Sequence, residues 1–105
     1  MNPSALTRKV IVSNPQGLHA RPADMLVRLA NRFRADVQVG KGGEWVDCKS
    51  ILSVLTLGAT QGTELSVTAD GVDAEEALQA VTELIESGFD EADNGSGEPP
   101  APAAR

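Results

Sequence analysis

Two kinds of apolar periodicity alternate along this chain, and their order restricts the folds that it can adopt. Four segments alternate apolar and polar residues, which is typical of half-buried strands: 7–13, 36–40, 44–48 and 64–69. Three segments repeat apolar residues every three or four positions, which predicts amphipathic helices: 20–33, 51–57 and 74–87. The resulting order, β-α-β-β-α-β-α, predicts a split β-α-β arrangement with one sheet and its helices on one face.

Turn and cap residues separate these segments. Asn14-Pro15-Gln16-Gly17 predicts a turn before the first helix, and Lys41-Gly42-Gly43 predicts a hairpin between the second and third strands. Asp73 is expected to cap the last helix, and Glu76, three residues later, completes a capping-box pattern. Gly88 is expected to end that helix.

Small apolar residues must form the core, because only 3% of the chain is aromatic. The strand residues expected to face the helices are Val10, Val12, Val37, Val39, Val46, Cys48, Leu65, Val67 and Ala69. The helix residues expected to face the sheet are Leu26, Leu29, Ala30, Phe33, Ala77, Leu78, Val81, Leu84 and Ile85. Trp45 is expected on the opposite face of the sheet, as a surface packing residue.

Length and composition exclude several classes of protein. A chain of 105 residues is long enough for one compact domain and too short for two. No apolar run is long enough to span a membrane, and the N-terminus lacks the apolar stretch of a signal peptide. Cys48 is the only cysteine, and no Cys/His cluster has the spacing of a metal site. We therefore expect a cytoplasmic protein without metal, cofactor or membrane insertion.

Charge is unevenly distributed along the chain, whose net charge is −6. Residues 1–50 hold eight of the nine basic residues and four acids, whereas residues 51–105 hold Arg105 and eleven acids. This distribution argues against general nucleic-acid binding. It favours docking to an acidic protein surface, or contact with a phosphate, through one basic face.

The composition changes after residue 88. Residues 89–105 read FDEADNGSGEPPAPAAR, in which Gly, Pro, Ala and acids dominate. We expect a folded domain over residues 1–88 and a disordered tail over 89–105 with little functional content. A tail that recruits a partner is the alternative.

The only histidine, His19, lies where the predicted turn ends and the first helix begins. The first N–H groups of a helix lack internal acceptors, and the helix dipole adds partial positive charge there. The N–H groups of Ala20 and Arg21 can therefore bind an anion beside His19, and the Arg21 guanidinium adds further donors. Pro22 costs little in the first turn, and Gly17 allows the preceding turn to come close.

An imidazole beside an anion site can act as a nucleophile toward phosphorus. No second acid or base, no phosphate-binding glycine loop and no metal-ligand spacing accompanies His19 in the sequence. We therefore predict that His19 accepts a phosphoryl group from a partner enzyme and that the chain is a carrier rather than an enzyme. The structural alternative is a histidine that caps the helix or lies on the surface.

Ser50 stands before the second predicted helix, where a serine hydroxyl commonly caps free N–H groups. A plain N-cap is therefore one interpretation of Ser50. The other is a phosphorylation site, where the modification would add about two negative charges beside apolar residues. Among the apolar residues that follow, we expect at least Leu52 and Leu55 to be exposed as a docking patch.

Two segments carry a resemblance to a known family. Residues 17–33 read GLHARPADMLVRLANRF, and residues 48–65 read CKSILSVLTLGATQGTEL. They resemble the phosphorylation-site and regulatory-serine regions of HPr, the histidine-containing phosphocarrier of the bacterial phosphoenolpyruvate-dependent sugar phosphotransferase system. The resemblance extends over roughly residues 7–88. It implies an α+β open-faced sandwich with a single four-stranded antiparallel sheet and three helices on one face.

The resemblance also implies roles for individual residues. His19 would accept a phosphoryl group on Nδ1 from phospho-Enzyme I and pass it to a sugar-permease component or another acceptor, while Arg21 would stabilise the phosphate. Ser50 matches the serine that an ATP-dependent HPr kinase/phosphorylase modifies in many members. The residues expected to dock partners are Ile51, Leu52, Leu55 and Arg28.

Two residues near His19 depart from the family pattern. Gln16 stands where the family often has Ser or Asn, and we expect it to contact the phosphate together with Gly17, Ala20 and Arg21. Asp24 stands where members usually carry an uncharged residue. Its carboxylate is expected to disfavour an acidic partner or to select a different one.

Two other functions remain as alternatives to a monomeric phosphoryl carrier. The first is a purely regulatory docking module controlled by phosphorylation of Ser50, although such a module would not need His19, Arg21 and Pro22 together. The second is a small RNA-binding α/β domain, which requires exposed aromatic residues on the sheet and a basic surface. The chain offers only Trp45 on the sheet and a net charge of −6, which argues against RNA binding.

Overall fold

The computed structural model describes residues 5–90, without the side chain of Asp90. The elements are β1 (Leu6–Ile11), α1 (Ala20–Ala30), β2 (Asp36–Lys41), β3 (Glu44–Asp47), α2 (Ile51–Thr56), β4 (Glu64–Asp70), α3 (Ala74–Glu86) and the short 3-10 helix η1 (Gly88–Asp90). Their order confirms the predicted β-α-β-β-α-β-α sequence and adds η1. The tail predicted over residues 89–105 lies outside the described residues from position 91 onward.

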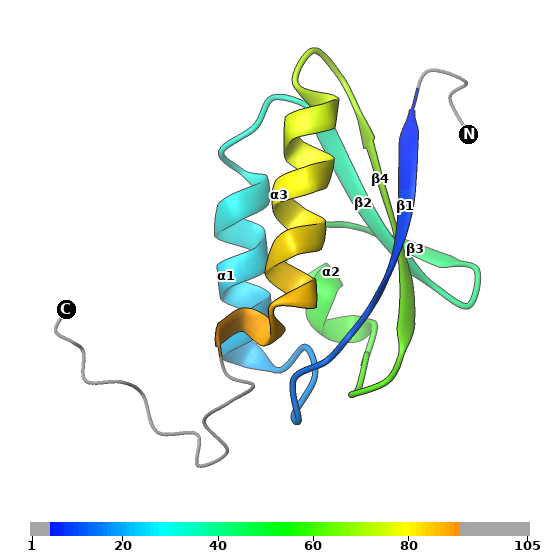
Figure 1. Cartoon of the computed structure of the whole chain (residues 1–105), viewed down its shortest axis with the longest axis vertical. Helices are drawn as coiled ribbons and strands as arrows, with labels where there is room; N and C mark the ends of the chain where they lie inside the picture. The colour runs from blue at the N-terminus through cyan, green and yellow to red at the C-terminus, as the bar shows by residue number, and fades with distance from the viewer. Residues whose placement is uncertain (1–4, 91–105) are drawn as a thin grey trace, which may run out of the picture.

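The four strands form one antiparallel sheet in the order β1-β4-β2-β3. The three α-helices lie together on one face of this sheet, which confirms the predicted open-faced α+β sandwich (Figure 1). The register places apolar residues opposite each other: Val10 pairs with Leu65, and Val39 pairs with both Val67 and Val46. A slip of one residue would turn these side chains to the solvent face, so burial of the helix-facing side fixes the register.

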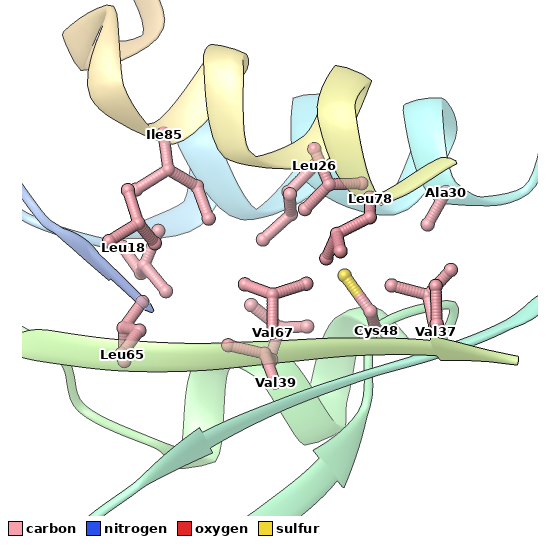
Figure 2. Packing of buried hydrophobic residues seen from close by; sticks show 14 of the residues in the cluster. Leu18, Leu26, Ala30, Val37, Val39, Cys48, Leu65, Val67, Leu78 and Ile85 are labelled. Carbon is pink, nitrogen blue, oxygen red and sulfur yellow. The ribbon is translucent and has the colours of Figure 1, made fainter. Parts of the chain in front are cut away.

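The core lies between the sheet and the helices and consists mainly of small side chains. Figure 2 shows strand residues such as Val39 and Val67 pointing toward Leu26 and Leu78 of the helices. Of the predicted strand residues all are buried except Val46, which is partly buried against the core. Of the predicted helix residues Leu29, Phe33 and Leu84 are partly buried and the others are buried. The periodicity therefore identified the helix-facing and sheet-facing residues correctly.

Cys48 and Trp45 occupy the two faces that the alternation predicted. The Cys48 thiol is fully buried, and this desolvation raises its pKa to about 12, so the thiol stays protonated. The Trp45 ring lies on the outer face of the sheet over Gly40, its partner on β2, where an added Cβ would come within 2.8 Å of the ring. Cys48 is thus a small core residue and Trp45 a surface packing residue, as expected.

Helix α1 ends at Ala30, three residues before the end that the periodicity predicted at Phe33. The Asn31 side-chain amide donates to the carbonyls of Val27 and Lys49, at 2.9 and 3.3 Å. The Lys49 ammonium in turn donates to the carbonyl of Phe33, at 2.8 Å. These side chains bind the Val27 carbonyl of the last turn and two carbonyls outside the helix, so they stabilise the exit of the chain from α1 toward β2.

The capping box predicted at Asp73 and Glu76 is wrong. Asp73 is the N-cap residue of α3, but its side chain makes no capping hydrogen bond to the helix. Its two carboxylate oxygens instead accept hydrogen bonds from the N–H groups of Arg34 and Ala35, at 2.9 and 2.8 Å. These hydrogen bonds, that from Arg34 first, hold the pKa of Asp73 below its usual range. Gly71 packs against Ala35 at the same point, so a long-range link between loops replaces the local cap.

The folded part extends past the predicted boundary at residue 88. Gly88 ends α3 with a positive φ of 74°, as expected, but Phe89, taken as the first residue of the tail, is only 2% exposed. Phe89 has a φ of 57°, an uncommon conformation for a bulky residue. Its ring closes the core at the end of α3, much as an apolar residue after a helix-ending glycine often does.

Candidate functional site

The turn before α1 is held by a buried asparagine. The N–H of Gly17 donates to the carbonyl of Asn14 at 3.1 Å, which confirms the predicted turn. The Asn14 side-chain amide is buried and donates to the carbonyl of Gly17 at 2.8 Å, closing the turn a second time. Because the Gly17 N–H is already engaged, the contribution of Gly17 to the site is conformational.

Gly17 also brings the turn against the loop between α2 and β4. Its φ is +66°, and a Cβ at this position would clash with the carbonyl of Ala59 and lie 2.8 Å from the Cα of Thr60. The next residue, Leu18, donates its N–H to the carbonyl of Ala59 at 2.9 Å and inserts its side chain into the core. Only glycine fits this close approach, which fixes the chain immediately before His19.

His19 is the N-cap residue of α1, with φ −80° and ψ −169°, and its carbonyl accepts the first helical hydrogen bond from Ala23 at 2.9 Å. Its side chain makes no capping hydrogen bond, so the interpretation of His19 as a side-chain cap is wrong. The imidazole is partly exposed and its Nε2 atom is buried.

The residues that follow His19 present donors at the surface. Ala20 and Arg21 are both exposed in the first turn of α1, where backbone N–H groups have no acceptor within the helix. Pro22, which has no N–H, is buried in the third helical position. Gln16 is exposed in the adjacent turn. The predicted phosphate-contacting residues are thus grouped at one helix end, on a backbone that the Gly17 turn immobilises.

Ser50 is the N-cap residue of α2, and its Oγ accepts a hydrogen bond from the N–H of Ser53 at 3.4 Å. This confirms that Ser50 caps the helix. The bond is long, which makes the cap weak. Ser50 is partly exposed, so its hydroxyl also borders the solvent.

The apolar residues of α2 divide between core and surface. Val54 and Leu57 are buried, Ile51 and Leu55 are partly buried, and Leu52 is 72% exposed. The expected exposure of Leu52 is confirmed, whereas Leu55 contributes only part of its side chain to the surface. Because α2 packs against α1, these residues and the exposed side of α1 belong to neighbouring helices.

Asp24 and Arg28 form an ion pair on α1, with 2.9 Å between the Arg28 Nε and an Asp24 carboxylate oxygen. The residues are four positions apart, a spacing that brings side chains together on a helix surface. The separate roles predicted for Asp24 and Arg28 did not include this pairing, although the four-residue spacing indicates it. Arg28 therefore offsets the negative charge that Asp24 adds near His19.

Within the described range, 5–90, two kinds of functional feature are absent. No group of three or more His, Cys, Asp or Glu side chains is arranged to hold a metal ion. No helix in this range is long and apolar enough to cross a membrane.

Comparison with known proteins agrees with this geometry. Residues 6–87 match the family model described as the PTS HPr component phosphorylation site. The phosphocarrier protein HPr of Xylella fastidiosa (strain 9a5c) is 41% identical over 86 residues, which are 82% of this chain and 97% of that protein.

Two solved structures are also similar. The HPr-C-His structure from Thermoanaerobacter tengcongensis has a TM-score of 0.79 and 40% identity, and the match covers 82% of this chain and 97% of that one. A structure described as an HPr dimer from the same organism has a TM-score of 0.65 and 41% identity, with 76% and 92% coverage. The match to the family model and this level of identity establish that the chain belongs to the HPr family of phosphocarriers of the phosphotransferase system.

Proposed function

We propose that His19 accepts a phosphoryl group from phospho-Enzyme I and passes it to a downstream acceptor of the phosphotransferase system. The observation that carries this proposal is the placement of the partly exposed imidazole at the N-cap of α1, with Nε2 buried. The lone pair of Nδ1 would attack phosphorus, a P–N bond would form, and the bond from phosphorus to the donor atom would break. In the second transfer the same P–N bond breaks toward the acceptor.

The surroundings of His19 suit the phosphorylated state. The N–H groups of Ala20 and Arg21 and the positive end of the α1 dipole would bind a phosphate carried by the ring. The Arg21 guanidinium would add charge-assisted hydrogen bonds, and the exposed Gln16 amide would add a neutral donor. The backbone that leads into these donors is held by the hydrogen bonds of the Gly17 turn, so little backbone reorganisation would accompany transfer.

The protein would act as a stoichiometric carrier rather than as an enzyme. His19 lies at a helix end and is partly exposed, and a cavity of about 300 Å³ lies elsewhere, between α1 and α3. A partly exposed nucleophile at a helix end suits an acceptor that partner enzymes reach from outside. We further propose that the carrier acts as a monomer and docks partners through Arg28 on α1 and Ile51, Leu52 and Leu55 on α2.

We propose a second, regulatory role for Ser50, as the substrate of an HPr kinase/phosphorylase. Its partly exposed hydroxyl is held only by the 3.4 Å hydrogen bond from Ser53. A phosphate there would retain a capping acceptor for α2 while adding about two negative charges within two residues of the exposed Leu52. Modification would therefore weaken partner docking while leaving the fold intact.

Incubation with phosphoenolpyruvate and the cognate Enzyme I tests the first proposal. The wild-type chain is expected to acquire one acid-labile phosphate, and His19→Ala is expected to lose it completely. Ser50→Ala is the matched control, because it changes the N-cap residue of the neighbouring helix and should keep the label. A label that persists in His19→Ala, or no label on the wild-type chain, would overturn the carrier proposal.

The same assay separates the carrier from a purely regulatory module. A regulatory module would bind its partner with the same affinity in wild-type and His19→Ala chains and would acquire no label from Enzyme I. A carrier would show label transfer from His19 to a second protein, measured as loss of phosphate from this chain. Size-exclusion chromatography with light scattering tests the proposed monomer.

A further inference from the structure

The surface between α1 and α3 contains a depression that the proposed phosphoryl transfer does not use. Its volume is about 300 Å³, and it is lined by Met25, Arg28, Leu29, Arg32 and Leu84. The three apolar residues are partly buried and pack against the core, while the two arginines are exposed. The depression therefore combines an apolar floor with a basic rim, and an occupant should offer small apolar groups together with acids.

The two sides of this depression differ in charge. On the α1 side, Arg28 and Arg32 supply positive charge, and Asp24 offsets part of it through its ion pair with Arg28. Four exposed residues of α3 are acidic: Glu75, Glu76, Glu83 and Glu86. An acidic occupant would therefore be repelled from α3 and drawn to Arg28 and Arg32.

The chain itself continues past α3 with a segment of this chemistry. After Asp90, residues 91–105 contain Glu91, Asp93 and Glu98, together with a run of prolines and alanines that ends at Arg105. The segment lies outside residues 6–87, which match the family model, so the HPr fold itself does not require it. Acids followed by small apolar residues match the rim and the floor of the depression.

The point at which this segment starts allows it to reach the depression. Helices α1 and α3 lie side by side and antiparallel, so η1, at the end of α3, follows on the side where α1 begins (Figure 1). At about 1.5 Å per helical residue, Arg28 lies roughly 12 Å along α1 from Ala20, and Arg32 follows just after the end of the helix. An extended chain spans about 3.3 Å per residue, so Asp93 can reach about 10 Å beyond Asp90 and Glu98 about 26 Å.

We propose that the segment of this chain after Asp90 occupies the depression between α1 and α3. Asp93 and Glu98 would pair with Arg28 and Arg32, and the alanines and prolines would cover Met25, Leu29 and Leu84. Each exposed ion pair is weak, but the short tether replaces a bimolecular association with an intramolecular one. This inference goes beyond the proposed function and does not depend on phosphoryl transfer.

A spin label on the full chain tests the proposal. Ser96→Cys places a thiol between Asp93 and Glu98, and the native Cys48 should stay unlabelled because it is fully buried. The nitroxide is expected to lower the amide NMR signals of Arg28, Leu29 and Arg32 at least about twofold in dilute buffer, because a short tether gives an effective concentration on the order of millimolar. In about 1 M salt, where the Debye length falls to about 3 Å, the signals should recover.

Charge variants and a mixing experiment complete the test. The double variant Arg28→Gln with Arg32→Gln is expected to restore the signals, whereas the matched control, Lys9→Gln with Lys41→Gln, removes the same charge from the sheet and should not. Unchanged groove signals in the labelled wild-type chain, or lowered signals that persist in the arginine variant, would overturn the proposal. Lowered signals in a mixture where the label and the ¹⁵N nuclei are on different chains would also overturn it, since a second copy would then be the occupant.

Discussion

Helices α1 and α2 both begin at an N-cap residue in extended conformation, but the two residues use their side chains differently. Ser50 turns its Oγ back to accept from Ser53, so one of the first N–H groups of α2 is satisfied within the chain. The His19 side chain makes no capping hydrogen bond, and the first N–H groups of α1 have no acceptor within the helix. A helix that gives up its side-chain cap gains an anion site, which is the property that a phosphate-accepting histidine needs.

Substitution of His19, the N-cap residue of α1, tests this difference between the two helices most directly. Both His19→Ser and His19→Ala are expected to lose phosphate acceptance from Enzyme I completely. Only the serine can cap α1 as Ser50 caps α2, so His19→Ser should be more stable than His19→Ala by about 1 kcal/mol in thermal or urea unfolding. Equal stability of the two variants would show that another group already satisfies the first N–H groups of α1.

The turn that carries His19 is expected to tolerate substitution poorly. In Gly17→Ala the conformational cost of a positive φ adds to the steric cost of the clash with Ala59 and Thr60. We therefore expect a loss of about 2–4 kcal/mol in the free energy of unfolding. Gly42→Ala is the matched control, because Gly42 has a similar φ of +58° with nothing within 4 Å of the added Cβ. It should cost only about 1 kcal/mol, the conformational penalty alone. Similar losses in both variants would mean that the loop at Ala59 moves aside.

The N-terminus of α3 provides a third case, in which the N-cap residue serves a distant loop. Asp73 accepts hydrogen bonds from the N–H groups of Arg34 and Ala35, and its pKa is lowered as a result. A lowered pKa means that the stabilisation is present above the usual value of 3.8 and is lost as the pH falls through the lower value of the folded state. Asp73→Asn should therefore be less stable than the wild type at pH 7, and the two unfolding curves should converge in acid. A difference that stays constant from pH 7 to strong acid would contradict this.

Most of the fold could be predicted from the sequence because the core residues recur with regular periods. The alternation of Val37 with Val39, and of Leu65 with Val67, defines the buried face of the sheet without knowledge of the strand order. The features that were missed depend on residues far apart in the sequence. The carboxylate of Asp73 accepts hydrogen bonds from Arg34 and Ala35, which lie 39 and 38 residues earlier in the chain. No local sequence pattern predicts this contact.

The candidate site was predictable for a different reason, since its donors are consecutive residues. His19, Ala20 and Arg21 follow one another at a helix start, so their grouping needs no tertiary information. The support beneath them was not predictable. The contact of Gly17 with Ala59 and Thr60 joins segments about 40 residues apart, and the burial of Nε2 depends on the packing of the complete domain.

Removing the cap of α2 should have a smaller effect than the changes at α1. Ser50→Ala loses a hydrogen bond of 3.4 Å, and we expect a loss of about 0.5–1 kcal/mol in urea unfolding. Ser50→Asp keeps a capping acceptor and should retain the stability of the wild type, while its charge beside Leu52 slows phosphate transfer from Enzyme I. If Ser50→Asp accepts phosphate as fast as the wild type, the proposed regulation by charge is wrong.

The smallest effect on stability is expected at the ion pair between Asp24 and Arg28 on α1. Asp24→Asn removes the 2.9 Å pair with Arg28, in which the side chains are 47% and 79% exposed, so we expect a loss of about 0.3–0.5 kcal/mol at low ionic strength and none in about 1 M salt. The function should change in the opposite direction. With Arg28 released and one negative charge removed near His19, docking to an acidic partner should become faster, measured as the rate of phosphate transfer from Enzyme I. Lys9→Gln, which alters a charge on the sheet, should leave that rate unchanged. A slower transfer in Asp24→Asn would instead mean that Asp24 holds Arg28 in the orientation that the partner recognises.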